Sequence, residues 1–136
     1  MFNKIICITL LLCLTLGIHH TASAQQKGMI IRISEIEIIP AHLQEYKDIL
    51  EEEAAASVKL EPGVIAIFPM YQKEVPEQIR ILEMYASKAA YEQHLQTPHF
   101  KKYKSSTLKM VKSLKLTDMT AIDSASMALI FKKLED

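Results

Sequence analysis

The residue types best suited to chemistry are concentrated in one short stretch, YEQHLQTPHFKKY, at residues 91–103. It contains two histidines, His94 and His99, five positions apart on either side of a Thr-Pro pair. Because an imidazole titrates near neutral pH, each histidine is a candidate general base or hydrogen-bond partner. The alternative for each is a capping or surface histidine without a chemical role.

The Thr-Pro pair predicts how the two histidines are held. Thr97 offers a side-chain oxygen for a helix N-cap, and Pro98 suits the first helical position. His99 would then lie at the helix N-terminus, where the helix dipole favours a neutral imidazole. His94 would lie near the end of a preceding short helix, on the same side as Tyr91. Because the Thr-Pro break keeps the two imidazoles off a common helical face, the spacing predicts no metal site.

Aromatic residues form a second group of candidates. They are either core residues or the walls of a flat pocket for a planar organic ligand. The group consists of Phe68, Tyr71, Tyr85, Tyr91, Phe100 and Tyr103. Arg80 and Glu83 fall on opposite faces of one predicted strand, so only one of them can face the helices. Glu83 is either a buried carboxylate in the pocket or an exposed cross-strand partner.

Several other classes of function lack their sequence signals. The chain has no phosphate-binding loop, no dinucleotide fingerprint and no Ser-His-Asp motif. It has 16 basic and 16 acidic residues, and nothing indicates a nucleic-acid partner. Residues 45–53 are acidic and residues 101–115 are rich in lysine, which two solvated helix faces explain. Attraction of an anionic ligand or of a neighbouring subunit is the alternative.

Residues 1–24 are expected to form a secretory signal peptide. Lys4 gives a basic start, residues 5–18 are apolar, and Ala22-Ser23-Ala24 supplies the small residues that signal peptidase recognises. We expect cleavage after Ala24 and a periplasmic or secreted protein. No stable membrane anchor would remain, because the apolar run is short for a membrane span. An uncleaved anchor and a lipoprotein acylated at Cys13 are the alternatives.

The remaining chain, residues 25–136, is long enough for one small domain. We expect its core to span residues 29–122, followed by a tail at residues 123–136. Both cysteines, Cys7 and Cys13, lie in the predicted signal, so the exported domain would have no disulfide and no cysteine ligand. Packing, helped by oligomerisation, would have to hold it together.

Hydrophobic periodicity predicts the elements that position these residues. Strands are predicted at residues 29–39, 64–74, 78–87 and 114–122, and helices at residues 40–61, at residues 88–95 and from Thr97 onward. The apolar stripe of the first helix consists of Leu43, Tyr46, Leu50, Ala54 and Ser57 or Val58, with the acidic residues opposite.

Two strands and the tail leave alternatives open. In the first strand the apolar residues change parity between Ile33 and Ile36, so either both faces are partly buried or a bulge shifts the register. In the second strand Pro69 indicates an edge position or a bulge. The tail is ambiguous, with a fifth short strand around residues 127–131 as one interpretation.

The order β-α-β-β-α-β predicts an α+β fold of the ferredoxin-like split type. In this fold a four-stranded antiparallel sheet carries both helices on one face. The strands are nevertheless apolar on both faces. The uncovered face therefore predicts a partner subunit or a ligand pocket, and we expect a homodimer.

The segment EMYASKAAYEQHLQTPHFKKY, residues 83–103, resembles the hallmark segment of the antibiotic biosynthesis monooxygenase (ABM) superfamily. It is most similar to small bacterial quinol monooxygenases, which share the E-x-aromatic-x-S start and the HLQTPH core. The order of elements over residues 29–122 matches by pattern. The resemblance implies a dimeric α+β barrel of ferredoxin-like domains, with a pocket between sheet and helices.

The resemblance also implies an activity, the oxidation of a quinol or other dihydroxy-aromatic by O2 without flavin, haem or metal. The protein would supply a base, hydrogen bonds to the oxyanion and exclusion of water. His99 would be the base or oxyanion partner, and His94 the second catalytic candidate. The implied substrate-binding residues are Tyr71, Arg80, Glu83, Tyr85, Tyr91, Phe100 and Tyr103, with Tyr85 where many members have tryptophan.

The chain differs from these relatives in having no tryptophan and in offering Arg32 and Ser34 in place of a first-strand asparagine. Three other functions found on this fold therefore stay open. They are an isomerase of a small phosphorylated sugar-like signal, a haem-binding or haem-degrading protein with His99 as ligand, and a non-catalytic binding module. Fold alone does not decide among them.

Overall fold

The computed structural model describes residues 28–135, so the predicted signal peptide lies outside the described residues. The elements are β1 (Ile30–Ile38), the 3₁₀ turn η2 (Pro40–His42), α1 (Leu43–Leu60), β2 (Val64–Tyr71), β3 (Gln78–Tyr85), α2 (Lys88–His94), α3 (Pro98–Thr107), the 3₁₀ turn η3 (Leu108–Met110), β4 (Val111–Met119) and α4 (Ala125–Glu135). Among them, no helix combines the length and the apolar character that crossing a membrane requires.

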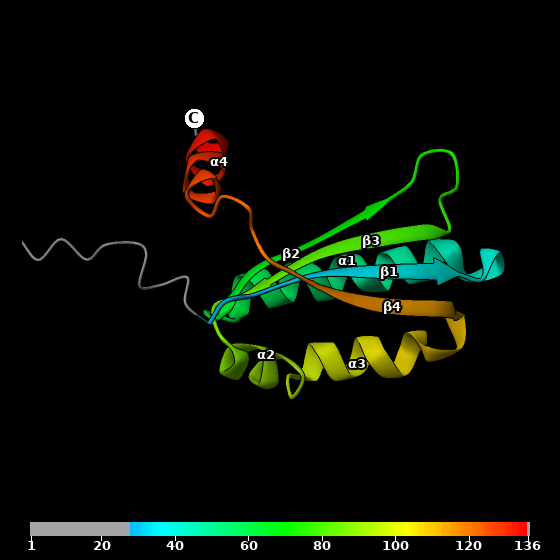
Figure 1. Ribbon diagram of the computed structural model, residues 1–136. Helices are drawn as coiled ribbons and strands as arrows, with labels where there is room; N and C mark the ends of the chain where they lie inside the picture. The colour runs from blue at the N-terminus through cyan, green and yellow to red at the C-terminus, as the bar shows by residue number, and fades with distance from the viewer. Residues whose placement is uncertain (1–27, 136) are drawn as a thin grey trace, which may run out of the picture.

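The four strands form one antiparallel sheet in the order β2-β3-β1-β4. The helices α1, α2 and α3 lie on one side of this sheet, and α4 stands apart from them on the other side (Figure 1). α1 also packs against α3. This arrangement confirms the predicted ferredoxin-like α+β fold.

β1 is a central strand with apolar residues on both faces. Ser34, Ile36 and Ile38 are buried against the helices, whereas Ile31 and Ile33 are half-buried on the other face. The register between β1 and β3 is continuous from Ile30 to Glu37. Burial on both faces, rather than a bulge, therefore explains the change of parity.

The core lies between the sheet and the helices. Its centre consists of Ile36, Ile38, Tyr46, Leu50, Ala54, Ile79, Ile81, Tyr85 and Met110. The predicted stripe of α1 supplies one wall of this core. Val58 belongs to the exposed side of α1, so Ser57 is the member of the stripe at that turn.

One acidic residue of α1 departs from the prediction. Glu53 is only 5% exposed, although the acidic residues were expected on the outer face. It lies four residues before the buried Ser57 and accepts a hydrogen bond of 2.8 Å from the Ser57 hydroxyl. A residue at this spacing shares the buried face of the helix, and a local hydroxyl donor makes its burial possible.

The second strand confirms the interpretation of Pro69, because β2 is an edge strand of the sheet. The irregularity in its pairing with β3 lies at the start of the strand, between Val64 and Ala66. Proline is tolerated at an edge because its missing N–H costs no ladder hydrogen bond there.

Two expectations for the C-terminal part were wrong. β4 begins at Val111 rather than at residue 114 and ends at Met119, because η3 ends the helical region at Met110. The tail forms α4 rather than a fifth strand. Met127, Ile130 and Leu134 repeat at helical intervals, and the backbone N–H of Ala125 donates to Asp123 Oδ1 at 3.0 Å at the start of the helix.

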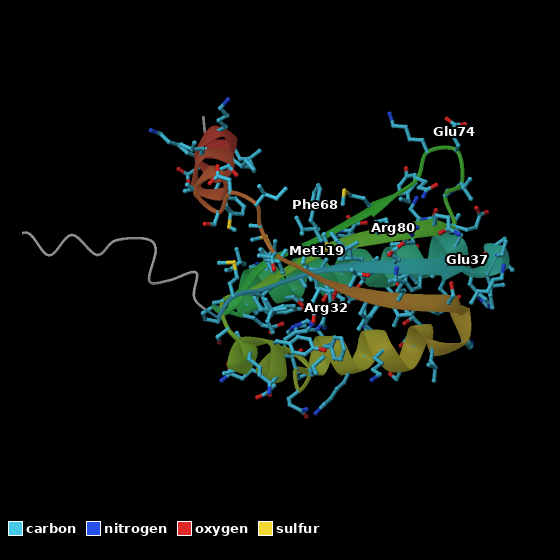
Figure 2. The ribbon with its side chains drawn as sticks, viewed as in Figure 1. Arg32, Glu37, Phe68, Glu74, Arg80 and Met119 are labelled. Carbon is cyan, nitrogen blue, oxygen red and sulfur yellow. The ribbon has the colours of Figure 1, made fainter. Side chains whose placement is uncertain are left out.

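The face of the sheet opposite α1, α2 and α3 is largely open, and we call it the open face. Figure 2 shows Phe68 and Met119 pointing away from these helices, whereas Arg32 points toward α2 and α3. Phe68 is 59% exposed and Met119 is 49% exposed. α4 covers one end of this face, where Met127 and Met119 line a shallow hollow.

Candidate active site

A cavity of about 250 Å³ lies between the sheet and the helices. Its walls are mainly aromatic and aliphatic, and its aromatic residues are Tyr85, Tyr91, Phe100 and Tyr103. The polar residues that line it are Arg32, Ser34, Glu53, Glu83, His94 and Lys104. A largely apolar hollow with a few converging polar groups is the usual form of a small-molecule site.

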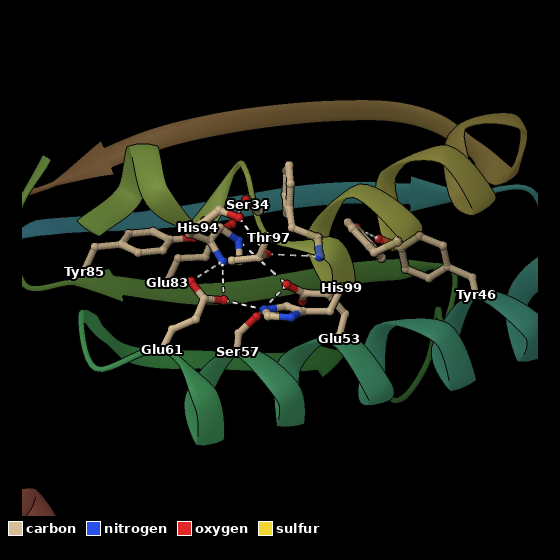
Figure 3. A network of polar contacts seen from close by, with 12 residues as sticks. Ser34, Tyr46, Glu53, Ser57, Glu61, Glu83, Tyr85, His94, Thr97 and His99 are labelled. Atoms are coloured by element: carbon tan, nitrogen blue, oxygen red, sulfur yellow. Dashed lines mark hydrogen bonds and ion pairs between the residues drawn. The ribbon is translucent and has the colours of Figure 1, made fainter. Parts of the chain in front are cut away.

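His94 is the buried histidine of this cavity. It ends α2 and is 2% exposed. Its Nδ1 lies 3.0 Å from Glu61 Oε1, and its Nε2 lies 3.7 Å from Glu53 Oε1 (Figure 3). The ring packs against Phe100, with 4.7 Å between the ring centroids. Carboxylates therefore face both nitrogens of the imidazole.

His99 lies outside the cavity but belongs to the same polar network. Its Nε2 is 2.5 Å from Glu61 Oε1, so Glu61 bridges the two histidines. Thr97 caps α3 as predicted, with its side-chain oxygen accepting a hydrogen bond from the backbone N–H of Phe100. Pro98 follows at the helix start, and this fixes the position of His99.

The Thr-Pro break places the two imidazoles on different helices, as expected, but the two rings nevertheless lie close to each other. The turn between α2 and α3 brings His94 and His99 together, with 6.5 Å between their ring centroids. The reason is a third residue, Glu61, which follows the end of α1 and reaches both rings. One candidate ligand atom from each of these three residues lies within 4.8 Å of the others.

The pKa values of the two carboxylates beside His94, Glu53 and Glu61, are shifted in opposite directions. Burial raises the pKa of Glu53, and this outweighs the hydrogen bond from Ser57. Burial acts in the same sense on Glu61, but hydrogen bonds from His99 and His94 outweigh it and lower the pKa of Glu61. Glu61 is thus held as a carboxylate, while the surroundings of Glu53 favour its neutral acid.

Glu83 faces the cavity, which answers the question that its strand parity left open. Its carboxylate accepts hydrogen bonds from the hydroxyls of Ser34 and Tyr85, the latter at 2.8 Å. Burial raises the pKa of Tyr85, so this phenol remains a hydrogen-bond donor. Glu83 therefore lies at the sheet wall of the cavity, with its two oxygens oriented by neighbouring hydroxyls.

Arg32 places a cation at the same wall. Its Nε donates to Asp118 Oδ1 at 2.7 Å, and its guanidinium lies 4.8 Å from the centroid of the Tyr91 ring. The hydrogen bond to Asp118 raises the pKa of Arg32 further above its usual value. The guanidinium is therefore a permanent positive charge at the cavity.

Two predicted substrate-binding residues lie away from the cavity. Tyr71 is 50% exposed near the end of β2, where the Lys47 ammonium lies 4.0 Å from the centroid of its ring. Arg80 is on the open face, with its guanidinium 3.5 Å from Glu35. The other predicted substrate-binding residues, Glu83, Tyr85, Tyr91, Phe100 and Tyr103, all line the cavity.

Sequence reasoning missed two residues of this site, Glu53 and Glu61. A signal was present for both, because they continue the helical stripe of Ser57 at intervals of four residues in either direction. The acidic run that surrounds Glu53 masked this signal. The Pro62-Gly63 pair after Glu61 marked that residue only as the end of a helix.

Residues 29–106 match the sequence family described as antibiotic biosynthesis monooxygenase (ABM). The match covers more than half of the chain, and the chain belongs to this family. This confirms the resemblance carried by residues 83–103. The family and its solved members define a monooxygenase-like protein.

Solved structures agree with this assignment. A candidate antibiotic biosynthesis monooxygenase from Bacteroides thetaiotaomicron VPI-5482 has 46% sequence identity and a TM-score of 0.70, over 71% of this chain and 92% of that chain. A candidate monooxygenase from Lactobacillus acidophilus NCFM has 27% identity and a TM-score of 0.67, over 70% of this chain and 45% of that chain.

A third structure, from Caulobacter crescentus CB15, supports the fold. This candidate antibiotic biosynthesis monooxygenase has 24% identity and a TM-score of 0.66, over 77% of this chain and 100% of that chain. Among proteins with curated descriptions, no match was found.

Proposed function

We propose that this protein oxidises a quinol or related dihydroxy-aromatic with O2, with His94 as the general base. One observation carries the proposal: a buried imidazole lies at an aromatic-walled cavity, with its Nδ1 anchored on the ionised Glu61. A histidine held in this way by a carboxylate has a fixed orientation and a fixed tautomer.

The anchor determines which nitrogen reacts. With Nδ1–H donated to Glu61, Nε2 carries the lone pair and becomes the basic atom. Nε2 belongs to a cavity-lining residue and lies 3.7 Å from Glu53, which lines the same cavity. A phenolic hydroxyl in the cavity that approaches both side chains from the same side would be within reach of the base. This geometry favours His94 over His99, since His99 does not line the cavity.

Deprotonation of the substrate creates an oxyanion, and the cavity offers a charge to stabilise it. The Arg32 guanidinium is permanently positive, and the apolar walls of the cavity lower the local dielectric and so strengthen its effect. The Tyr85 hydroxyl is committed to Glu83 at 2.8 Å, so it shapes the wall rather than meeting the oxyanion directly. Arg32 is thus the residue we assign to the oxyanion.

The reaction balances without a separate reductant. The quinolate passes one electron to O2, and the resulting semiquinone and superoxide combine into a carbon-bound peroxide. Loss of water from this peroxide leaves a hydroxyquinone, so a quinol with a free ring C–H and O2 give hydroxyquinone and water. Transfer of the second electron without C–O bond formation gives instead the quinone and H2O2. Glu53 lines the same cavity and burial raises its pKa, so it is the residue that we assign to protonation of the peroxide.

The size of the cavity limits the substrate. Its volume of about 250 Å³ lies just below the range of roughly 300–1,000 Å³ that is typical of ligand sites. A planar molecule of one or two fused rings is therefore the expected substrate class. The aromatic walls would stack on such a ring and exclude water from the reacting oxygen.

Oxygen uptake with a reduced naphthoquinone tests the proposal. We expect uptake well above the non-enzymatic rate, and a loss of roughly 10²–10⁴-fold in His94→Gln, which removes the base. His42→Ala is the matched control, since His42 also pairs with a glutamate, Glu45 at 3.7 Å, but lies away from the cavity. Catalase added to the assay separates the two products, because it returns oxygen only where H2O2 is formed.

Two results would contradict the assignment. Oxygen uptake that stays at the non-enzymatic rate would exclude this substrate class, and saturable binding of the quinone without uptake would indicate a binding module. Uptake that survives in His94→Gln would place the base elsewhere.

A further inference from the structure

Two imidazole nitrogens converge on one carboxylate at the outer end of the site. His94 Nδ1 and His99 Nε2 lie 3.0 and 2.5 Å from the same oxygen, Glu61 Oε1. We propose that Glu61, His94 and His99 form a binding site for a divalent transition-metal ion such as Zn²⁺. Two imidazoles with one carboxylate are a common donor set for zinc, which leaves a further position open.

The separations of the three groups suit such an ion after a small adjustment. Their candidate ligand atoms all lie within 4.8 Å of one another. Zinc–ligand bonds of roughly 2.0–2.2 Å place tetrahedral ligands roughly 3.4 Å apart. The Glu61 oxygen therefore has to withdraw from the imidazoles by about an ångström as the ion enters. Glu61 follows the last residue of α1, and its side chain is 13% exposed, so it is not enclosed on every side.

The residues around the three ligands suit a metal site as well. A metal-bound histidine commonly donates its other N–H to a carboxylate. His94 has this arrangement, because Nδ1 faces Glu61 while Nε2 faces Glu53 at 3.7 Å. Glu53 is itself held by the Ser57 hydroxyl at 2.8 Å. The imidazole would thus be fixed from both sides.

The site is open to solvent from the outside of the domain. The side chains of His99 and Glu61 are 19% and 13% exposed, whereas that of His94 is 3% exposed. An ion can therefore reach the cluster beside α3 without passing through the aromatic cavity. The ionised carboxylate of Glu61 contacts both imidazoles, and its negative charge favours a cation at this place.

The ion and the general base would compete for one side chain. A metal bound at Nδ1 forces the proton of His94 onto Nε2, and Nε2 is the atom that we assign as the base. Zinc should therefore inhibit the reaction. This consequence rests on the proposed function, whereas the binding site itself does not.

Calorimetric titration with ZnCl2 tests the site directly. All samples carry His19→Ala and His20→Ala and no affinity tag, so that the only histidines are His42, His94 and His99. We expect one zinc ion per chain, and affinity at least tenfold weaker in His99→Ala and in Glu61→Gln. His42→Ala should bind as the parent does. Co²⁺ absorption in the parent should show the intense visible bands of a tetrahedral site with nitrogen and oxygen ligands.

The results separate this inference from the proposed function. Zinc binding that is equally strong in the parent and in His99→Ala, or no zinc binding to the parent, would overturn the metal site. Circular dichroism of each variant establishes that it is folded. Oxygen uptake is then measured as a ratio with and without zinc for each protein, and inhibition should be lost in His99→Ala. Absence of uptake in the zinc-free parent would contradict the proposed function and leave the calorimetric result as it stands.

Discussion

Glu61 contacts a ring nitrogen of both histidines, although it does not line the cavity itself. Its carboxylate accepts from His94 at 3.0 Å and from His99 at 2.5 Å. These hydrogen bonds lower its pKa against the effect of burial, so the residue stays ionised near neutral pH. An ionised acceptor at Nδ1 leaves the opposite nitrogen of His94 basic, which makes Glu61 a positioning residue.

Replacing this carboxylate with an amide should disturb the tautomer of His94. We expect Glu61→Gln to lower kcat roughly 10- to 100-fold with little change in KM, because the cavity keeps its shape while the orienting charge is lost. Nitrogen-15 NMR of the imidazoles should show a changed distribution of the proton between Nδ1 and Nε2 of His94. A variant with an unchanged His94 tautomer and unchanged kcat would contradict this role.

At the scale of the elements, two tyrosines connect α1 to α3 across the core. The hydroxyls of Tyr46 and Tyr103 lie 2.7 Å apart, and Tyr46 is fully buried. Burial raises the pKa of Tyr103 to about 12, so both groups stay neutral and one donates to the other. The pair thus fixes the helix that carries His99 relative to the helix that carries Glu53.

A mutant cycle measures this connection. Tyr46→Phe should lower the free energy of unfolding by about 1–2 kcal/mol, because it leaves a buried hydroxyl with one partner fewer. Tyr103→Phe should cost about the same. The double variant should lose clearly less than the sum of the two, since no hydroxyl is then left unpaired. Strict additivity in urea unfolding would show that the hydrogen bond contributes nothing to stability.

The turn after α1 depends on a close approach that only glycine allows. A Cβ added at Gly63 would lie 2.4 Å from the Cβ of Ala90 in α2. The Gly63 carbonyl also accepts from the Ala86 backbone N–H at 2.8 Å, which docks the turn against the end of β3. This turn sets the distance between Glu61 and the helix that ends in His94.

Gly63→Ala should therefore push the turn and α2 apart. We expect a loss of about 1–3 kcal/mol in the free energy of unfolding, as for other overpacked sites. The compensating change Ala90→Gly removes the clash, so the double variant should recover part of the loss in chemical denaturation. A double variant that is less stable than Gly63→Ala alone would show that contact with Ala90 is not the cause.

The elements were more predictable from the sequence than the site was. Thr97-Pro98, Pro62-Gly63 and the apolar periodicity act locally, so they predicted the start of α3, the end of α1 and the β-α-β-β-α-β order. The contact between His94 and Glu61 joins residues 33 positions apart in the sequence. It depends on where the ends of α1 and α2 lie in the folded domain, and no local sequence pattern predicts this. The tail stayed ambiguous because Met127, Leu129 and Phe131 alternate over a length too short to separate strand from helix.

At the scale of the whole molecule, the open face is an exposed sheet surface that, within residues 28–135, only α4 covers at one end. It carries exposed apolar residues on β2 and β4, including Phe68, Met70 and Met119. α4 adds Leu129, Ile130 and Leu134, each more than half exposed. Monomeric proteins rarely expose an apolar surface of this kind, and a second copy of the chain offers a matching one.

Charge on the open face also favours self-association. The Arg80 guanidinium lies 3.5 Å from the Glu35 carboxylate, and the Lys115 ammonium lies 3.3 Å from the same carboxylate. Positive and negative side chains therefore lie next to each other on this face. A surface with positive charges, negative charges and an apolar area can pair with the same surface of a second copy across a two-fold axis. We therefore expect the protein to be a homodimer that buries this face.

A single charge in the apolar part tests the dimer. Phe68→Glu should weaken dimerisation by tenfold or more, about 1.4 kcal/mol, because a carboxylate would be buried without a partner. Val58→Glu is the matched control, since Val58 is an exposed apolar residue, 48% exposed, on the side of α1 away from the sheet. Sedimentation equilibrium should show a dimer for the parent and for Val58→Glu, and monomer for Phe68→Glu at low concentration. A monomeric parent, or a Phe68→Glu variant as dimeric as the control, would mean that the open face is not the interface.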